Sequence, residues 1–396
     1  MTASRSRKLG GLPGLLLALF MICDRVHADD TGKATNPVTA PSKALAGMLP
    51  NDKWKQVESS VDRALAWMST QQEAGGSFST LPQAQPAVTS FCVLAFLSRG
   101  YQPGRGPYGQ QLNRAIDFVV SCQKPDGLFS FEIPEPLFVT RRASHTATYN
   151  HAIAGLMLGE VYGHVTGQRA KAVRQAIQKA LQFTRELQTR PKDNPFDKGG
   201  WRYLHFKGNG EPDSDLSVTA WQLMFLRSAR NAEFDVPQVY VDEAVAFVKN
   251  CWDTQEAAFT YARSADGSYF GSTRGMMGAG ILSLSMAGQH QTPMARAAGD
   301  WLLAHPFGGY GEVVNGGDHF LYSCYYCSQA AMQLGGHYWE GIFPPLMETL
   351  LSAQLPDGSW PADPSHNDAM FGNLYATSLA VLSLTPPFQL LPVYQK

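Results

Sequence analysis

The chain has 396 residues, of which 44% are hydrophobic and 16% are charged, and its formal net charge at pH 7 is −1. This composition supplies enough apolar surface for a large core and too little charge for a disordered chain. Because basic and acidic residues are balanced and no basic stripe stands out, we expect no nucleic-acid partner.

The first 28 residues have the layout of a secretory signal peptide. Arg5, Arg7 and Lys8 precede an apolar stretch from Leu9 to Ile22, and Val26-His27-Ala28 offers a cleavage site. The apolar stretch is too short to cross a bilayer comfortably. We therefore expect cleavage of segment 1–28 after Ala28 and a secreted or periplasmic protein, with an uncleaved anchor as the alternative.

Two further expectations concern the mature chain. Residues 29–50 are rich in Thr, Ala and Pro and are expected to form a disordered linker before a single domain at 51–396. Every later segment is interrupted by polar residues within 18 positions, so we expect no transmembrane segment in the mature chain.

The domain carries a repeated turn. Pro125-Asp126-Gly127-Leu128-Phe129 and Pro356-Asp357-Gly358-Ser359-Trp360 are nearly the same pentapeptide, and each follows a Gln two residues earlier. Less complete copies extend the series, and an insertion at 189–198 explains its longest spacing. The six aromatic positions, spaced 50 to 72 residues apart, are Phe78, Phe129, Trp201, Phe259, Tyr310 and Trp360.

An amphipathic segment precedes each turn, and a more apolar segment follows it. In segments such as 115–118, apolar residues recur at helical spacing with charges between them, which predicts a surface helix with one buried face. Segments such as 89–97 and 377–384 have little charge and predict buried helices. Since one hairpin cannot bury its apolar face alone, six outer-helix, turn, inner-helix units must stack into a closed ring or an open solenoid.

The residues that recur in the turns have a structural interpretation. A tight helix exit favours a left-handed residue without a Cβ, which accounts for the Gly. The Gln before the turn is predicted to bond backbone groups left open at helix ends. Five Cys remain after residue 28, and we expect mostly buried thiols.

Segments 65–78 and 350–360 resemble the Gln-Trp motifs of the prenyltransferase and squalene cyclase repeat superfamily, which also contains the terpenoid cyclases. The resemblance covers about residues 54–396. It implies an all-α fold, a single (α/α)6 toroid with inner and outer helix rings around a central cavity, and so favours a ring over a solenoid. Segments 54–71, 149–154 and 386–395 resemble a bacterial exported subgroup of that superfamily.

One candidate catalytic pair precedes an inner helix. Asp213-Ser214-Asp215 resembles the D-x-D-D-T-A acid motif of class II terpene cyclases, in which a protonated carboxyl group protonates an alkene or epoxide. By that match Asp215 is the proton donor and Asp213 its partner, but Leu216 replaces the third acid. The alternative is that Asp215 or Ser217 caps the helix.

A second set of candidates lies at the start of another inner helix. His145, Tyr149, Asn150 and His151 belong to the residue types that toroid-fold polysaccharide lyases use, with Tyr149 or His151 as the acid–base group. Helical geometry places 145 and 149 on one face and turns 150 and 151 elsewhere. Four residues are expected to line the cavity, namely Asn150, His145, Trp221 and Tyr325.

Other chemistries have less support. Asp318, Cys324, Cys327 and His337 do not match the zinc spacing of protein prenyltransferases, and a lone C-x-x-C lacks the second pair that zinc needs. We expect no metal and no cofactor.

Function remains open between two classes. The favoured interpretation is a binding or scaffold protein of the cell envelope for an apolar, glycan or protein ligand. The alternative is an enzyme acting in the toroid cavity, either cyclase-like through Asp215 or lyase-like through Tyr149 and His151.

Overall fold

The computed structural model describes residues 49–395 apart from 207–209, 315 and 364–366. All the helices below belong to one compact unit, residues 36–396. The predicted signal peptide (1–28) and nearly all of the predicted linker (29–50) lie outside the described residues, so both stay predictions.

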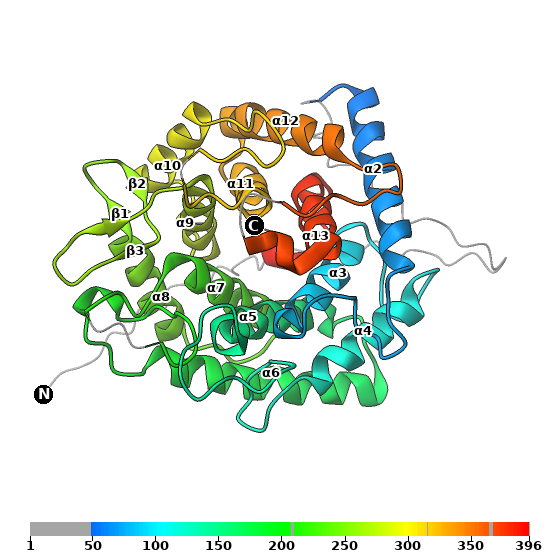
Figure 1. Ribbon diagram of the computed structural model, residues 1–396, viewed down its shortest axis with the longest axis horizontal. Coiled ribbons are helices and arrows are strands. Elements are labelled where there is room, and N and C mark those ends of the chain that lie inside the picture. Colours follow the sequence, from blue (N-terminus) through cyan, green and yellow to red (C-terminus); the bar gives the residue numbers. More distant parts are fainter. Residues whose placement is uncertain (1–48, 207–209, 315, 364–366, 396) are drawn as a thin grey trace, which may run out of the picture. The chain divides into compact units, whose positions relative to one another are not determined.

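Outer and inner helices alternate along the described chain and form two concentric rings (Figure 1). The outer ring consists of α2 (Asn51–Ser69), α4 (Gly109–Ser121), α6 (Gly167–Gln188), α8 (Gln238–Asn250), α10 (Pro293–Ala304) and α12 (Gly336–Ala353). The inner ring consists of α3 (Ala87–Ser98), α5 (Ala143–Tyr162), α7 (Leu216–Asn231), α9 (Arg274–Met286), α11 (Phe320–Leu334) and α13 (Gly372–Leu384). The predicted all-α (α/α)6 toroid is confirmed.

Burial separates the two rings as the sequence pattern predicts. Every residue of α3 is buried, whereas α4 buries one stripe that includes Leu112, Ile116 and Val119. The inner helices pack closely on both sides, and small residues make this possible. A Cβ added at Gly155 of α5 would lie 2.7 Å from the Phe225 ring of α7. Small residues in the inner helices therefore set the spacing between them.

The inner ring is closed. Each inner helix packs against the next one in the chain, and α13 packs against α3. In the outer ring α12 meets α2, where the Gln354 Nε2 donates to the Ser60 backbone oxygen at 2.9 Å. The closed ring, and not the open solenoid, is therefore the arrangement of this chain.

In four of the six turns a Gln joins neighbouring repeats, which corrects its predicted role at helix ends. Gln123 Nε2 donates to the oxygen of Gly127 in its own turn (3.1 Å) and to that of Ala176 in the middle of α6 (2.8 Å). The same pair of bonds recurs for Gln72, Gln188 and Gln354. The bonds reach the next outer helix because each turn lies directly against it.

Short strands and 3-10 turns interrupt the helices. Strands β1 (Trp252–Asp253) and β2 (Ala258–Phe259) pair antiparallel, as do β3 (Ala262–Arg263) and β4 (Tyr269–Phe270). The 3-10 helices are η1 (Pro82–Ala84), η2 (Pro195–Asp197), η3 (Asn367–Phe371), η4 (Pro386–Phe388) and η5 (Pro392–Tyr394). These elements are not predictable from the sequence pattern, because segments of two to five residues carry no detectable period.

Side chains fill the middle of the inner ring. Trp221 of α7 stacks on Tyr325 of α11 with ring centroids 5.1 Å apart, and Phe91 of α3 meets the edge of Trp221 at 5.3 Å. All three are buried. Trp221 and Tyr325, predicted to line a cavity, thus occupy the ring axis themselves.

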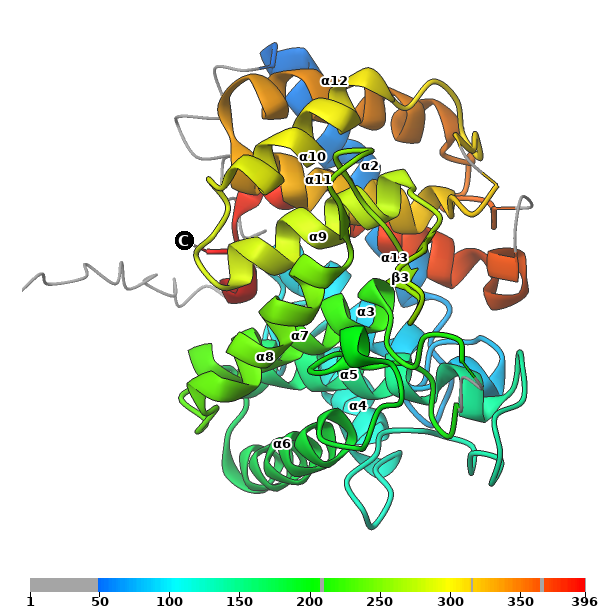
Figure 2. The same ribbon diagram turned by 90° about the vertical axis from the view of Figure 1, so that its left-hand side faces the viewer.

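The two ends of the ring differ (Figure 2). The loops that precede the inner helices gather at one end, which we call the N-terminal rim. Residues 386–395 cover the other end, where the inner helices finish (Figure 1). Among the described residues, no helix has both the length and the apolar character needed to cross a bilayer.

Candidate functional site

Partly exposed tyrosines gather at the N-terminal rim around the start of α7. We call these tyrosines, together with the arginine, aspartate and serine that contact them, the rim cluster. It consists of Tyr149, Arg202, Tyr203, Asp215, Ser217, Tyr261 and Tyr322.

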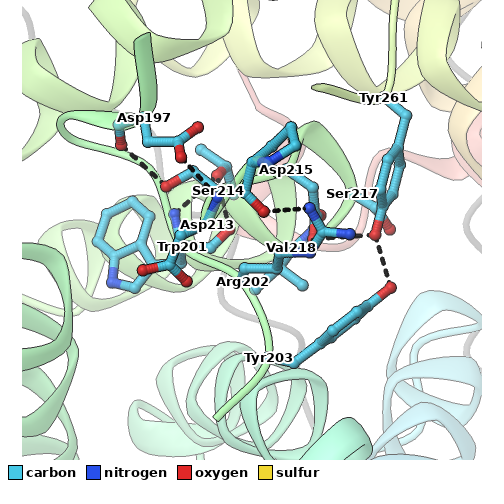
Figure 3. A network of polar contacts seen from close by, with 12 residues as sticks. Asp197, Trp201, Arg202, Tyr203, Asp213, Ser214, Asp215, Ser217, Val218 and Tyr261 are labelled. Atoms are coloured by element: carbon cyan, nitrogen blue, oxygen red, sulfur yellow. Dashed lines mark hydrogen bonds and ion pairs between the residues drawn. The ribbon is translucent and has the colours of Figure 1, made fainter. Parts of the chain in front are cut away.

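Two chains of hydrogen bonds organise the rim cluster. In the first, the Tyr261 hydroxyl donates to Asp215 Oδ2 at 3.0 Å and lies 2.6 Å from the Tyr203 hydroxyl (Figure 3). In the second, Ser217 Oγ lies 2.9 Å from the Tyr149 hydroxyl and 2.8 Å from the Tyr322 hydroxyl. Because Asp215 and Ser217 are two residues apart, both chains meet at the first turn of α7.

Asp215 combines a structural role with an unusual electrostatic setting. It is the N-cap of α7, and its Oδ1 accepts from the Val218 amide at 2.7 Å. Its side chain is fully buried, and desolvation raises the pKa of the Asp215 carboxyl to about 6. Arg202, whose Nε lies 3.8 Å from Oδ2, opposes that rise together with Val218 N–H and Tyr261. The predicted cap is present, and the second carboxyl oxygen faces the tyrosines.

Aromatic faces surround Arg202 on its outer side. The Tyr203 ring stacks on Phe138 with centroids 5.3 Å apart, and the edges of Phe206 and His145 meet Phe138 at 5.1 and 5.6 Å. The guanidinium carbon of Arg202 lies 4.4 Å from the Phe206 centroid. Each of these aromatic side chains is partly exposed, so the rim offers flat apolar surfaces beside polar groups.

Two of the predicted lyase-type residues join this region. Tyr149 belongs to the rim cluster, and desolvation raises the pKa of its hydroxyl well above the ordinary value. His145 Nδ1 accepts from the Arg141 amide at 3.0 Å. Desolvation, with Arg202 and Arg141 nearby, lowers the pKa of His145 to about 4, so this ring is neutral at pH 7.

The other two lie away from the rim tyrosines. His151 Nδ1 accepts from the Phe129 amide at 3.2 Å, and its Nε2 lies 2.9 Å from Thr184 Oγ1. Desolvation lowers the pKa of the fully buried His151 to about 3. Asn150 Oδ1 accepts from the Ala87 amide at 3.1 Å and so links α5 to the start of α3. Both side chains form hydrogen bonds inside the fold. This agrees with the helical spacing, which predicted that residues 150 and 151 lie on a different face of the helix from 145 and 149.

His151 has counterparts in other repeats. In three turns a threonine of the inner helix accepts from the amide of the turn aromatic, at 2.9 to 3.1 Å. These pairs are Thr89 with Phe78, Thr219 with Trp201 and Thr377 with Trp360. His151 makes the same bond in the second repeat, which gives it a structural role.

Asp213 points to a different neighbour from Asp215. Lys192 Nζ donates to the Asp213 backbone oxygen at 2.6 Å and lies 3.6 Å from its Oδ2. The Asp213 amide donates to Asp197 Oδ2 at 2.5 Å, which fixes the turn before α7 (Figure 3). Burial raises the pKa of Asp213, and Lys192 opposes that rise. The two acids of the predicted motif therefore have separate partners.

Two of the residues considered for zinc have partners in the core. Asp318 Oδ2 accepts from Arg274 Nε at 2.7 Å within the core, and the Cys327 thiol donates to the Arg274 backbone oxygen at 3.2 Å. All five described cysteines are free and buried. Within the described ranges, no group of three or more His, Cys, Asp or Glu side chains is placed to hold a metal ion.

Five members of the rim cluster were not predicted from the sequence, although a signal existed for two of them. Tyr203 and Tyr261 both lie two residues after a turn aromatic, Trp201 and Phe259. Comparison of that position across repeats would have selected them. Arg202, Ser217 and Tyr322 carry no such mark.

The chain is similar to solved structures of several α/α toroids. A variant of the type II terpene cyclase MstE from Scytonema, in complex with geranylgeranyl dihydroxybenzoate, is 13% identical with a TM-score of 0.58 and covers 87% of this chain and 100% of that one. D-mannose isomerase is 14% identical with a TM-score of 0.59 (85% and 99%), and a GH76 α-mannanase from Bacteroides thetaiotaomicron is 12% identical with a TM-score of 0.57 (87% and 98%).

No protein-family model and no curated protein matches the chain. The structural similarity at these identities shows the fold. At that level the predicted resemblance to the terpenoid cyclase and prenyltransferase toroids is confirmed.

Proposed function

We propose that this protein is a toroid that binds a carbohydrate at its N-terminal rim. The observation that carries the proposal is the rim cluster, in which hydroxyl groups of four tyrosines and one guanidinium lie beside partly exposed aromatic faces. A sugar ring presents hydroxyl groups around its edge and apolar C–H faces, and tyrosine matches both with its polar tip and its flat ring.

The filled centre of the ring supports a ligand at the rim over an elongated apolar ligand inside. Trp221 contacts both Tyr325 and Phe91 in the middle of the ring, and close packing of this kind leaves no room for a terpene chain beside these side chains without rearrangement. Two of the similar toroids are named for mannose and mannan chemistry, and a third for terpene cyclisation. Since one fold hosts all three activities, the fold does not select the ligand, and the proposal of a carbohydrate depends on the rim residues.

Calorimetry with a panel of mannose, manno-oligosaccharides and uronic-acid oligosaccharides tests the proposal. Tyr203→Ala removes both the stacked ring and the hydroxyl, so we expect it to weaken binding about 10-fold or more. Tyr338→Phe is the matched control, because Tyr338 bonds the Arg296 oxygen on the outer ring. Failure of the wild-type protein to bind any member of the panel, or equal affinity of the Tyr203→Ala variant, would contradict carbohydrate binding.

A second candidate is proton transfer at the same site, with Asp215 as the acid–base group. It is favoured by one observation: Asp215 has a pKa raised to about 6, and its Oδ2 accepts a bond from Tyr261 at the rim. A carboxyl group with a pKa near neutrality both donates and accepts protons at working pH. Tyr149 and His151 have less support, because the pKa of Tyr149 is raised and both ring nitrogens of His151 are bonded in the core.

Asp215→Asn separates the two candidates, since asparagine is an equally good N-cap and keeps α7 in place. We expect the variant to retain carbohydrate affinity within a few-fold and to lose turnover. Turnover that persists in Asp215→Asn, on any substrate that the wild-type protein converts, would rule out Asp215 as the acid–base group.

We further propose that the protein acts outside the cytoplasm, on the strength of the signal-peptide layout of residues 1–28. N-terminal sequencing of the exported chain is expected to begin at Asp29. A chain that keeps residues 1–28 would support the uncleaved anchor instead.

A further inference from the structure

Residues 386–395, which include η4 and η5, form what we call the C-terminal plug. The plug lies across the end of the ring opposite the tyrosine rim (Figures 1 and 2). Its apolar side chains Phe388, Leu391 and Val393 are buried against the inner helices. The Tyr394 hydroxyl contacts the hydroxyl of Tyr325 and lies 3.8 Å from Met224 Sδ. The plug therefore covers the stacked pair at the centre of the ring.

Polar side chains from different inner helices hold the plug. Gln333 Nε2 of α11 donates to the Tyr394 backbone oxygen at 2.8 Å, and Asn231 Nδ2 of α7 donates to the Pro392 backbone oxygen at 3.0 Å. Arg99, just after α3, lies over the Phe388 ring at 5.2 Å. These groups keep a constant charge state near neutral pH, so they hold the plug equally at pH 5 and pH 8.

Glu160 of α5 is different because it is a buried acid. Its Oε2 accepts from the Val393 amide at 3.2 Å, and its Oε1 accepts from Ser228 Oγ at 2.5 Å. Only 4% of the residue is exposed. Glu160 and Leu391 of the plug also line a pocket of about 80 Å³, together with Tyr101 and His164, and a pocket of this size has room for water beside Glu160.

We propose that the C-terminal plug is a releasable closure of the ring and that Glu160 is its pH-sensitive latch. A neutral Glu160 holds Val393 without a buried charge, and an ionised Glu160 is stabilised when the plug moves away and water reaches it. Release would uncover Tyr325 and the Trp221 face behind it, and so open an aromatic surface to a ligand.

The direction of the pH effect follows from burial. Desolvation raises the pKa of Glu160 in the closed ring from 4.5 to about 7, with Ser228 and Val393 opposing the rise. A hydrated Glu160 in the open state titrates near the ordinary value. The closed state is therefore favoured most at low pH, and opening increases as pH rises from about 4.5 to about 7 and then levels off.

The other titratable groups near Glu160 are Tyr325 and Tyr394, which face it from α11 and η5, and Tyr101 and His164 across the pocket. Burial raises the pKa values of the three tyrosines, so they stay neutral over this range. Desolvation lowers the pKa of His164, and its titration must be separated from that of Glu160 by a variant.

Hydrogen exchange of the full chain, read at the Val393 amide and corrected for intrinsic rates, tests the latch. Protection of this amide is expected to fall about 10-fold or more between pH 5 and pH 8. Glu160→Gln keeps both hydrogen bonds without a titrating group and should abolish that change. His164→Asn is the matched control and should preserve it.

Ser228→Ala provides a second variant that keeps the carboxyl group. Loss of the Ser228 bond removes one of the groups that oppose the raised pKa, so the pH at which protection levels off should move upward. Protection of Val393 that is independent of pH, or the same pH dependence in Glu160→Gln and wild type, would overturn the proposal.

Discussion

In the second repeat a histidine accepts the hydrogen bond that a threonine accepts in three other repeats. His151 and the threonines at 89, 219 and 377 each accept a bond from the amide of a turn aromatic. The imidazole accepts this bond only while it is neutral, and its burial keeps it neutral. Because His151 must stay neutral to accept this bond, the free energy of unfolding is expected to fall at acid pH.

We predict that His151→Thr reduces the loss of stability in acid. His151 has a pKa near 3 when folded and near 6.5 when unfolded, so stability is full above pH 6.5 and falls as pH drops toward 3. From pH 7 to pH 5 this group alone costs about 2 kcal/mol. Urea denaturation of both proteins at pH 7 and pH 5 measures the difference, and an unchanged wild-type-to-variant difference would show that His151 does not titrate this way.

Sequence pattern revealed some of the site residues and missed others for identifiable reasons. Asp215 was found because it belongs to a short acidic motif, and Tyr149 because it lies at the start of an inner helix. Arg202 and Tyr322 come from loops and helices far apart in the chain, and only the folded ring brings them to Ser217 and Asp215. The sequence around these two residues contains no motif that would predict these contacts.

At the scale of elements, the glycine of four turns is required for two reasons. Gly199 has a φ of +87°, and a Cβ there would lie 2.2 Å from the Glu243 oxygen of α8. Gly76, Gly127 and Gly358 make equivalent approaches to the next outer helix. The left-handed conformation was predictable from the position of the Gly in the turn, but the close contact with a neighbouring repeat is visible only in the structure.

We predict that Gly199→Ala destabilises the protein by about 3 kcal/mol or more, since left-handed strain adds to overlap with a backbone atom. Gly267→Ala is the matched control. Gly267 has a φ of +89°, and its nearest neighbour is an Arg263 nitrogen at 3.7 Å, so strain alone should cost about 1–2 kcal/mol. Equal destabilisation of the two variants in urea would show that the contact with α8 contributes nothing.

The helices were predictable and the small strands were not. Amphipathic periodicity persists over whole outer helices such as α4, so the outer and inner rings followed from the pattern. The hairpins between α8 and α9 consist of two-residue strands, which depend on turns such as that at Gly267 and on packing around Phe259.

At the scale of the whole ring, one seam differs from the others because no chain crosses it. Gln354 joins α12 to α2 through bonds to Ser60 and Arg63. Gln123 makes the equivalent bonds within the chain, where consecutive repeats are also linked covalently. The seam between the ends thus depends on noncovalent contacts alone.

We predict that Gln354→Ala weakens hydrogen-exchange protection of α2 and α13 more than Gln123→Ala weakens that of α4 and α6. Each variant loses two bonds from Nε2, about 1–3 kcal/mol in total, but only at the open seam does the loss allow terminal helices to separate. Exchange measured by mass spectrometry on both variants checks this, and equal local losses would contradict a weaker seam.

Ring closure itself was predicted through the family resemblance, because repeat spacing alone left the solenoid open as an alternative. The plug was not predicted. Residues 386–395 are short, rich in Pro and without period, and their position at the end of the ring depends on contacts with four inner helices.

The contact between Ser60 and Gln354 spans 294 positions of the chain. Hairpins of roughly 50 residues form from local contacts, whereas this contact requires both ends of the chain to meet. We therefore expect a folding order in which hairpins assemble progressively and the first and last repeats join at the end. Until that step, α2 and α13 expose apolar faces that the finished ring conceals, so the unclosed chain is the species most exposed to aggregation.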